Sequence, residues 1–352
     1  MTRSALCRIH AERIALVKPS ALGDIVHALP VLEALRLRFP RAHITWIVQP
    51  AYAPLLIGHP ALDAVLYFDR PVYGGSSGWL RAAEAIQRLW HDVRRAHFDL
   101  VIDLQGLLRS GLLAVASGAR TRIGLADARE GARWCYTHCI PTAGLVHAVD
   151  RYWSVAEALG VGHGPKRFRV PIPAQASAQA EQLLAACRPP YVAIHPGARW
   201  ETKRWPLASF LALAERIHQH VGGTIVWIGS VEEARRCQHL LPTGDGHLSL
   251  VGKTPLPLLA ALLHRCHLVV SNDSGPLHLA AALGRPVLAP FLCTRPERNG
   301  PYGQRDHVVV TRVPCAGSLL RHCPLLACQQ ELTVDRLWPV AQTVLLGHRQ
   351  VA

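Results

Sequence analysis

Short apolar runs alternate with longer segments of helical periodicity along most of this chain, and this alternation constrains its fold more than any other feature. The runs that we interpret as strands are residues 14–17, 44–48, 64–68, 100–103, 191–195, 224–229, 267–271 and 286–290. The segments with helical periodicity are residues 25–38, 79–96, 107–116, 207–219, 232–240, 256–265, 274–283 and 334–346. This alternation is typical of βαβ units, in which helices cover a parallel sheet. The sequence therefore predicts an α/β fold.

The alternation is interrupted over residues 160–173, where glycines and prolines punctuate a basic segment. A length of 352 residues also suggests two domains, at about 150 residues per domain. We expect an N-terminal Rossmann-like domain over residues 1–165, a linker over 166–185, a second Rossmann-like domain over 186–330 and a C-terminal helix over 331–352. Ligands are expected where the carboxyl ends of the strands face an interdomain cleft.

The chain is strongly basic, with 38 Lys and Arg against 24 Asp and Glu and a net charge of +14. Such a charge favours anionic partners, which include nucleic acids, phosphorylated metabolites and acidic lipids. No basic stripe with interleaved aromatic residues is present, so nucleic-acid binding is disfavoured. Only four of the basic residues are lysines, which makes each of them worth individual attention: Lys18, Lys166, Lys203 and Lys253.

The sequence predicts a cytoplasmic protein. Its longest apolar stretches fall short of the ~18 residues that span a bilayer, and its first residues do not resemble a signal peptide. The ten cysteines are therefore expected to be reduced. Cys315, Cys323 and Cys328 cluster with the spacing C-x7-C-x4-C, which matches no common zinc pattern. We expect loop thiols there and no metal or other cofactor.

The first segment with chemical character is 18–24, which follows a predicted strand and opens a helix. Small residues, Gly23 and the free N–H groups of the helix make this corner a natural anion site. Asp24 lies at or near the helix N-terminus. It could cap the helix, or it could serve as a general base facing the expected cleft.

The second segment, 195–206, also lies between a predicted strand and a predicted helix. Gly197 permits a close approach of the backbone, and Thr202, Lys203 and Arg204 supply a hydroxyl and two cations. This combination suits a diphosphate. The alternative is a solvated basic loop.

The third segment, 271–284, predicts a strand end, a polar turn and an Ala-rich helix whose first turn is free to bind phosphate. Asp273 and Ser274 could equally be capping residues, and His278 could be a core histidine. The chain has no D-x-D pair, no G-x-G-x-x-G loop and no P-loop. An NAD enzyme and a P-loop kinase are therefore disfavoured.

In this order, the segments resemble glycosyltransferase family 9, the lipopolysaccharide heptosyltransferases, and most closely the first-heptose enzymes. The resemblance rests on VKPSALGDIVHALP (17–30), DLVIDLQGLLRSGLLA (99–114), HPGARWETKRWP (195–206) and NDSGPLHLAAALGRPV (272–287). It implies a GT-B fold of two Rossmann-like domains. It also implies inverting, metal-independent transfer of L-glycero-D-manno-heptose from ADP-heptose to the Kdo or heptose inner core of lipopolysaccharide. The cysteines near the C-terminus resemble those of some second-heptose relatives.

The resemblance also implies roles for individual residues. Asp24 matches the general base. The donor side comprises Thr202 and Lys203 for the diphosphate, Asp273, Ser274, Gly275 and His278 for the phosphates and heptose, and Glu232 or equally Glu233 for the ribose. On the acceptor and phosphate side, Lys18 and Ser20 match the phosphate-side loop of the family. We add Gly23, which lies in the same segment, and Arg129, one of the many arginines whose excess suits an acidic acceptor.

The expected partners are ADP-heptose and a lipid A–Kdo or heptosyl-Kdo-lipid A acceptor, with peripheral contact at the cytoplasmic face of the inner membrane and no nucleic acid. Two alternatives stay open. One is a GT-B enzyme that uses another nucleotide sugar, either a different glycosyltransferase or an epimerase. The other is a non-enzymatic basic module, for which the net charge is the only support.

Overall fold

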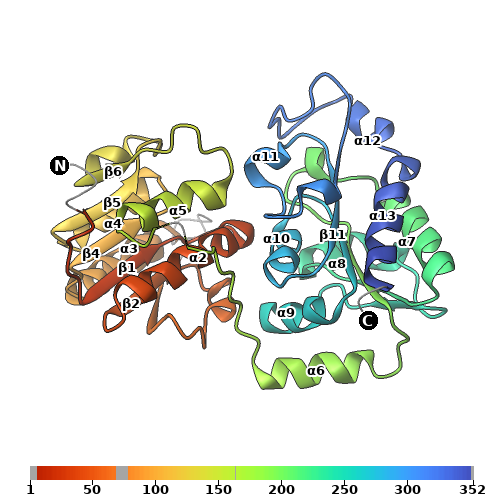
Figure 1. Cartoon of the computed structure of the whole chain (residues 1–352), viewed down its shortest axis with the longest axis horizontal. Coiled ribbons are helices and arrows are strands. Elements are labelled where there is room, and N and C mark those ends of the chain that lie inside the picture. The colour runs from red at the N-terminus through yellow and green to blue at the C-terminus, as the bar shows by residue number, and fades with distance from the viewer. Residues whose placement is uncertain (1–5, 69–77, 163, 350–352) are drawn as a thin grey trace. The chain divides into compact units, whose positions relative to one another are not determined.

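The structure is a computed structural model that describes residues 6–68, 78–162 and 164–349. The chain forms two compact units, Met1–Pro171 and Ile172–Ala352 (Figure 1). The segment that was expected to be a linker, 166–185, contains the helix α6 (Ala174–Leu184).

The first unit is built on a parallel sheet of six strands in the order β3-β2-β1-β4-β5-β6. Its strands are β1 (Arg13–Val17), β2 (His43–Val48), β3 (Ala64–Tyr67), β4 (Leu100–Asp103), β5 (Thr121–Leu125) and β6 (His138–Ile140). Its helices are α2 (Leu22–Arg38), α3 (Gly78–Arg95), α4 (Leu108–Ala116) and α5 (Ala148–Ala158), with the short turns η1 (Ala53–Leu55) and η2 (Ala132–Cys135). The four strands that the sequence predicts in this half are confirmed, whereas β5, β6 and α5 were not predicted.

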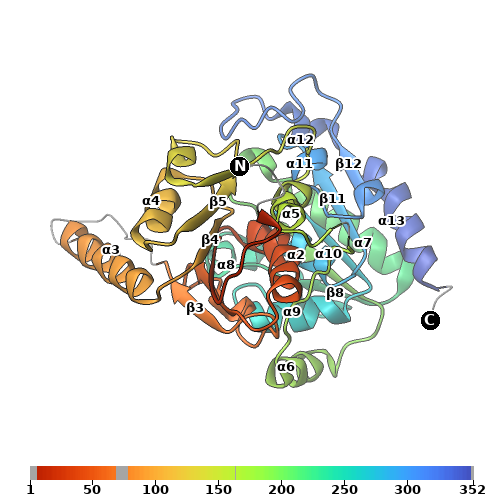
Figure 2. The same ribbon diagram turned by 60° about the vertical axis from the view of Figure 1, so that its left-hand side comes forward.

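Strand β1 shows why its sequence is an almost continuous apolar run. Every side chain from Ile14 to Val17 is buried, because helices cover both faces of the sheet. Ala15 and Val17 belong to a core that also contains Val93 of α3 and Leu113 of α4. Helices α2 and α5 contact each other and cover the opposite face (Figures 1 and 2).

The second unit repeats this plan with a parallel sheet of six strands in the order β12-β11-β10-β7-β8-β9. Its strands are β7 (Tyr191–His195), β8 (Thr224–Trp227), β9 (His247–Ser249), β10 (Leu268–Ser271), β11 (Val287–Phe291) and β12 (Val308–Val310). Its longer helices are α6, α7 (Leu207–Val221), α8 (Val231–Cys237), α9 (Leu256–Arg265), α10 (Gly275–Ala282) and α13 (Val334–Arg349). Its short ones are α11 (Pro296–Asn299), α12 (Ala327–Glu331), η3 (Glu201–Lys203), η4 (Gln238–Leu240) and η5 (Arg305–His307). Both units thus confirm the prediction of two Rossmann-like domains.

The core of the second unit anchors the loop that follows β7. Trp205 is fully buried, and its ring meets the ring of Phe210 edge-on, with the centroids 5.0 Å apart. The Trp205 indole donates to the backbone oxygen of Leu332, and its backbone N–H donates to Oδ1 of Asn272 at 3.0 Å. Burial of the indole therefore holds the loop after β7 against the end of β10.

Within the described residues, no helix combines the length and the apolar character needed to span a membrane. Each of the ten cysteines is free of disulfide bonds.

Candidate functional site

The order of the strands identifies one position in each unit where a ligand is expected. The strand order reverses between β1 and β4 in the first unit, and between β7 and β10 in the second. Ligands of open α/β sheets bind at such points, outside the carboxyl ends of the strands, which we call the carboxyl edge. The three segments singled out in the sequence follow β1, β7 and β10. The fold therefore brings the second and third segments together at one carboxyl edge.

Asp24 is the third residue of α2 in sequence, and the N-cap position belongs to Ala21. One carboxylate oxygen, Oδ2, accepts a hydrogen bond from the backbone N–H of Ala21 at 3.2 Å. The other, Oδ1, accepts from the hydroxyl of Tyr152 at 3.3 Å and lies 3.8 Å from Nζ of Lys18. The Asp24 side chain is 43% exposed. Asp24 thus supports the helix start, and its carboxylate is still accessible from solvent.

Lys18 lies inside the first unit, next to Asp24. Its side chain is buried, its ammonium donates to the backbone oxygen of Leu104 at 3.3 Å, and it lies 5.0 Å from the ring centroid of Tyr152. Burial alone would lower the pKa of Lys18, but the charge of Asp24 and the contacts with Tyr152 outweigh it and raise this pKa above its ordinary value. Lys18 therefore stays charged, with its ammonium 3.8 Å from Oδ1 of Asp24.

The remaining acceptor-side residues lie at two places in the first unit. Ser20 and Gly23 are partly exposed residues at the junction of β1 and α2. Arg129 is exposed, and its backbone N–H donates to the oxygen of Gly106 at 2.9 Å, beside the turn that follows β4. Tyr152 was missed by the sequence analysis. It comes from α5, and only the contact between α5 and α2 brings it to Asp24.

A buried carboxylate at the end of β4 supports this turn. The carboxylate of Asp103 accepts hydrogen bonds from the hydroxyl of Tyr136 at 2.6 Å and from the backbone N–H groups of Gln105 and Gly106 at 2.8 and 3.2 Å. Burial raises the pKa of Asp103, and these hydrogen bonds offset only part of that effect. A Cβ at Gly124 would lie 2.1 Å from the Tyr136 ring, so a glycine is required there. We interpret this cluster as structural.

In the second unit, Lys203, Asp273 and His278 meet at the start of α10. Nζ of Lys203 lies 2.6 Å from Oδ2 of Asp273, and Nε2 of His278 lies 3.4 Å from Oδ1. Burial would raise the pKa of Asp273, but the hydrogen bond from His278 and the charge of Lys203 hold it well below its ordinary value. Thr202 is buried and donates to the backbone oxygen of Leu320 at 2.6 Å.

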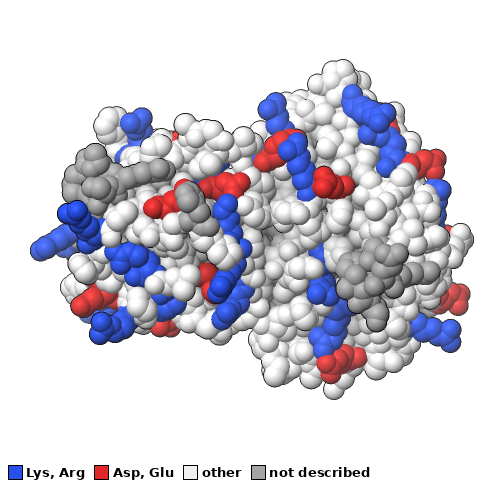
Figure 3. Space-filling model, viewed as in Figure 1, with Lys and Arg blue, Asp and Glu red and all other residues white. Residues whose placement is uncertain are grey.

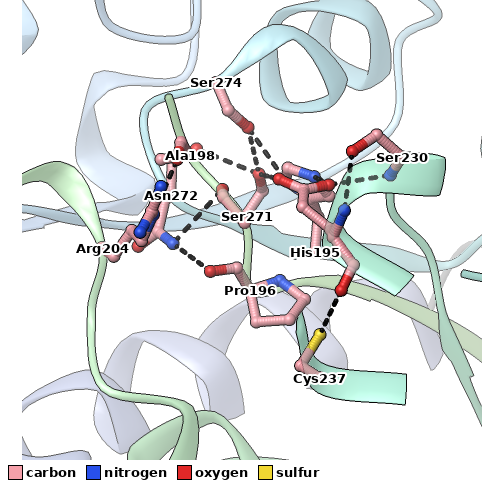
Figure 4. Close-up of polar contacts among 11 residues, drawn as sticks. His195, Pro196, Ala198, Arg204, Ser230, Cys237, Ser271, Asn272 and Ser274 are labelled. Carbon is pink, nitrogen blue, oxygen red and sulfur yellow. Dashed lines mark hydrogen bonds and ion pairs between the residues drawn. The ribbon is translucent and has the colours of Figure 1, made fainter. Parts of the chain in front are cut away.

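A second polar group, which contains Ser271, Ser274 and His195, lies at the same carboxyl edge (Figure 4). Ser274 is the N-cap of α10, but its hydroxyl lies 3.0 Å from Nδ1 of His195 and does not cap the helix. The hydroxyl of Ser271 lies 3.3 Å from the same nitrogen. Nε2 of His195 lies 3.2 Å from Oε2 of Glu233. The first turn of α10, which begins at Gly275, therefore has no side-chain cap on its N–H groups.

The structure separates the two glutamates that the sequence left as equal candidates. Glu232 is exposed and pairs with Arg236 one turn later on the surface of α8. Glu233 lies against the loop after β7, where a Cβ added to Gly197 would be 1.7 Å from Oε1. Burial would raise its pKa, but the hydrogen bonds from His195 and from the backbone of Ser230 lower it to about 2. Only Glu233 faces the carboxyl edge.

The charged side chains are mixed on the face shown in Figure 3. Lys and Arg lie on both units there, with Asp and Glu between them. Among the described residues, no group of three or more His, Cys, Asp and Glu side chains is arranged to hold a metal ion.

Comparison with known proteins gives consistent matches. The sequence model of "Glycosyltransferase family 9 (heptosyltransferase)" matches residues 86–328. The lipopolysaccharide heptosyltransferase 1 of Pseudomonas aeruginosa is 32% identical over 324 residues, which cover 88% of this chain and 87% of that protein. A family 9 glycosyltransferase structure from Veillonella parvula aligns with a TM-score of 0.77 at 23% identity, covering 96% and 97% of the chains. An Escherichia coli heptosyltransferase structure with ADP-2-deoxy-2-fluoro heptose aligns with a TM-score of 0.71 at 24% identity, covering 94% and 99%.

Proposed function

Since this chain belongs to glycosyltransferase family 9 (heptosyltransferase), we propose that it transfers L-glycero-D-manno-heptose from ADP-heptose to the Kdo or heptose inner core of lipopolysaccharide. We propose that the reaction inverts the anomeric carbon and needs no metal ion. The observation that carries the proposal is the meeting of Lys203 with the uncapped N-terminus of α10 at the carboxyl edge of the second unit. That arrangement suits the diphosphate of a nucleotide sugar.

The diphosphate of the donor is proposed to bind over the first turn of α10. The free N–H groups of this turn and the positive end of the helix dipole favour a negative charge there. Lys203 already neutralises Asp273 at 2.6 Å, so the diphosphate would share this ammonium with the carboxylate. Ser274 and Gly275 would contact the phosphates. The choice of ADP-heptose as donor follows relatives, one of which was solved with ADP-2-deoxy-2-fluoro heptose.

The ribose is proposed to bind Glu233. In Rossmann-like domains, an acidic residue near the end of the second strand accepts hydrogen bonds from ribose hydroxyls. Glu233 occupies the corresponding place after β8, and its low pKa keeps it an ionised acceptor. Glu232 is turned away and paired with Arg236. We therefore assign the ribose contact to Glu233 alone.

Asp24 is proposed to be the general base. It would take the proton of the acceptor hydroxyl, whose oxygen attacks the anomeric carbon while the bond to the ADP oxygen breaks. Lys18 and Tyr152 both contact Oδ1 of Asp24 and orient the carboxylate. Lys203 and the α10 N–H groups would stabilise the negative charge that develops on the departing ADP.

The acceptor is proposed to be lipid A–Kdo or heptosyl-Kdo-lipid A, reached from the cytoplasmic face of the inner membrane by peripheral contact. An exposed apolar surface supports this: Leu108, Leu112 and Val115 form one stripe of α4 and are 42–45% exposed, and Trp134 of the adjacent η2 is 84% exposed. Such a surface suits the interface of a bilayer. The fraction of protein that sediments with phosphatidylglycerol vesicles should be lower for a Trp134→Ser variant than for wild type. Equal fractions would exclude this surface as the site of membrane contact.

The proposal is tested first by calorimetric titration with ADP in the absence of added metal. We expect wild type to bind ADP and Lys203→Gln to bind it about 10- to 100-fold more weakly, as for loss of a charge-assisted contact. Lys253→Gln, which replaces an exposed lysine of the same unit, is the matched control and should bind like wild type.

A transfer assay then tests the chemistry. With ADP-heptose and a deacylated Kdo-lipid A acceptor, Asp24→Asn should lower kcat by about 10²- to 10⁴-fold while ADP affinity is retained. Near-wild-type turnover by Asp24→Asn would refute the assignment of the base. Turnover with a UDP-sugar and none with ADP-heptose would instead favour the alternative, a GT-B enzyme that uses another nucleotide sugar.

A further inference from the structure

A cavity of about 520 Å³ on the second unit has no role in the mechanism proposed above. It is lined by Arg199, Trp200, Glu201, Arg204, Arg321 and His322. Residues 199–204 follow β7, and residues 321 and 322 follow β12, so the cavity lies at the carboxyl edge of the sheet. Three arginines against one glutamate make its lining strongly basic.

Backbone and side-chain hydrogen bonds hold the two loops of this cavity together. The hydroxyl of Thr202 donates to the backbone oxygen of Leu320 at 2.6 Å, next to Arg321. The backbone N–H of Leu319 donates to the oxygen of Cys293 at 2.7 Å, at the end of β11. These contacts fasten the loop after β12 to the loop after β7. They bring Arg321 to the same cavity as Arg199, although the two residues are far apart in the sequence.

The lining of this cavity carries more positive than negative charge, with three arginines and one carboxylate, Glu201. No carboxylate among the described residues forms an ion pair with Arg199, Arg204 or Arg321. The guanidinium of Arg321 lies 4.8 Å from the ring centroid of Trp200, and Nζ of Lys203 lies 4.9 Å from the same centroid. Like charges gathered in this way are unfavourable unless an anion joins them. The arginine forks also match the geometry of a carboxylate or phosphate.

The place of the cavity along the carboxyl edge indicates which substrate it meets. The strands run β8, β7, β10, β11, β12 across the sheet. Glu233 follows β8, Lys203 and Ser274 lie at β7 and β10, and the loop of Arg321 is attached to the end of β11. A donor bound as proposed above, with its ribose at Glu233 and its diphosphate at α10, would extend its sugar along this order toward the cavity. An acceptor that attacks this sugar would then meet the cavity.

We propose that this cavity is an oxyanion subsite for the acceptor, in which Arg199, Arg204 and Arg321 bind a carboxylate or phosphate group close to the attacking hydroxyl. This inference rests on the proposed function, because it takes the acceptor to be acidic. It assigns a substrate contact to the loop after β12, which the transfer chemistry itself does not require.

The test compares Arg321→Gln with Arg312→Gln, which replaces an exposed arginine that does not line the cavity. With deacylated Kdo-lipid A, Arg321→Gln should raise the acceptor KM by about 10- to 100-fold. Its donor KM and ADP affinity should stay within twofold of wild type, and Arg312→Gln should match wild type throughout. Arg321→Lys should recover only part of the loss, because a lysine lacks the planar fork.

Two modified acceptors distinguish the source of the oxyanion. If the cavity binds a phosphate, wild type and Arg321→Gln should have the same acceptor KM with dephosphorylated acceptor. If it binds a carboxylate, they should have the same acceptor KM with an acceptor whose Kdo carboxylates are methyl esters. Calorimetric binding of deacylated Kdo-lipid A repeats the comparison without turnover. An unchanged acceptor affinity in Arg321→Gln, or a loss confined to ADP, would overturn the subsite even if wild type is fully active. If wild type shows no transfer but binds the acceptor more tightly than Arg321→Gln does, the proposed function is refuted and the subsite is retained.

Discussion

Replacing Lys203 by Gln should destabilise the second unit as well as weaken ADP binding. The substitution removes the charge 2.6 Å from Asp273, whose side chain is only 5% exposed, and leaves that carboxylate with His278. Removing one partner of a buried ion pair costs about 3–5 kcal/mol. The Lys203 side chain is 16% exposed, so we expect the lower end, about 3 kcal/mol. At about 2–4 °C per kcal/mol for a unit of this size, Tm should fall by about 6–12 °C.

The pH dependence of this loss follows from the direction of the Asp273 pKa. In the folded chain, this pKa lies below its ordinary value near 3.8. The pair therefore stabilises the folded state above that pH, and its contribution is lost as pH falls through the folded pKa. In Lys203→Gln, the pKa of Asp273 rises. The difference in unfolding free energy between the two proteins should be largest at neutral pH and shrink below about pH 4.

Urea denaturation at pH 7 and at successively lower pH measures this difference through the midpoint at constant m-value. Lys253→Gln is the control, and its unfolding free energy should stay within about 0.5 kcal/mol of wild type. A Lys203→Gln protein as stable as wild type at pH 7 would refute the reasoning. So would a loss that grows as pH falls below about 4, because protonation of Asp273 can only reduce the difference between the two proteins.

Three further outcomes are expected. Glu233→Gln should weaken ADP binding in calorimetric titration, whereas Glu232→Gln should leave it unchanged; the reverse result would contradict the ribose assignment. Gly197→Ala should destabilise the chain by about 1–3 kcal/mol, measured as a lower Tm, because its Cβ would push the Glu233 carboxylate off its hydrogen bonds with His195 and the backbone of Ser230. Tyr136→Phe should cost about 1.5–3 kcal/mol in urea denaturation at pH 7. Because the pKa of Asp103 is raised in the folded chain, wild type loses stability as pH rises above the ordinary pKa of an aspartate. Tyr136→Phe removes a hydrogen bond that lowers this pKa, so the loss should become steeper. A destabilisation by Tyr136→Phe that does not depend on pH would contradict this.

Most of the strands that the sequence predicted are buried on both faces; the exception is the edge strand β3, which is only partly buried but has the apolar sequence AVLY. Burial of both faces requires almost every residue to be apolar, as from Ile14 to Val17, and such runs are visible without a structure. Strands β5, β6, β9 and β12 were not predicted. Strands β6, β9 and β12 lie at the edges of their sheets, and β9 has only partly buried residues. Their pairing is decided by the neighbouring strand, so three-residue segments such as His247–Ser249 carry too little local signal.

The sequence by itself determined that polar segments follow β1, β7 and β10, because strand, loop and helix N-terminus are local patterns. Tertiary structure alone decided where the side chains of those segments point. Glu232 and Glu233 are neighbours on one helix turn, yet packing of α8 turns only Glu233 toward Gly197. Likewise Tyr152 reaches Asp24, and Arg321 reaches Trp200, through contacts between elements far apart in the chain. Periodicity encodes the faces that a core must bury, whereas partners in a polar site are brought together only by the completed fold.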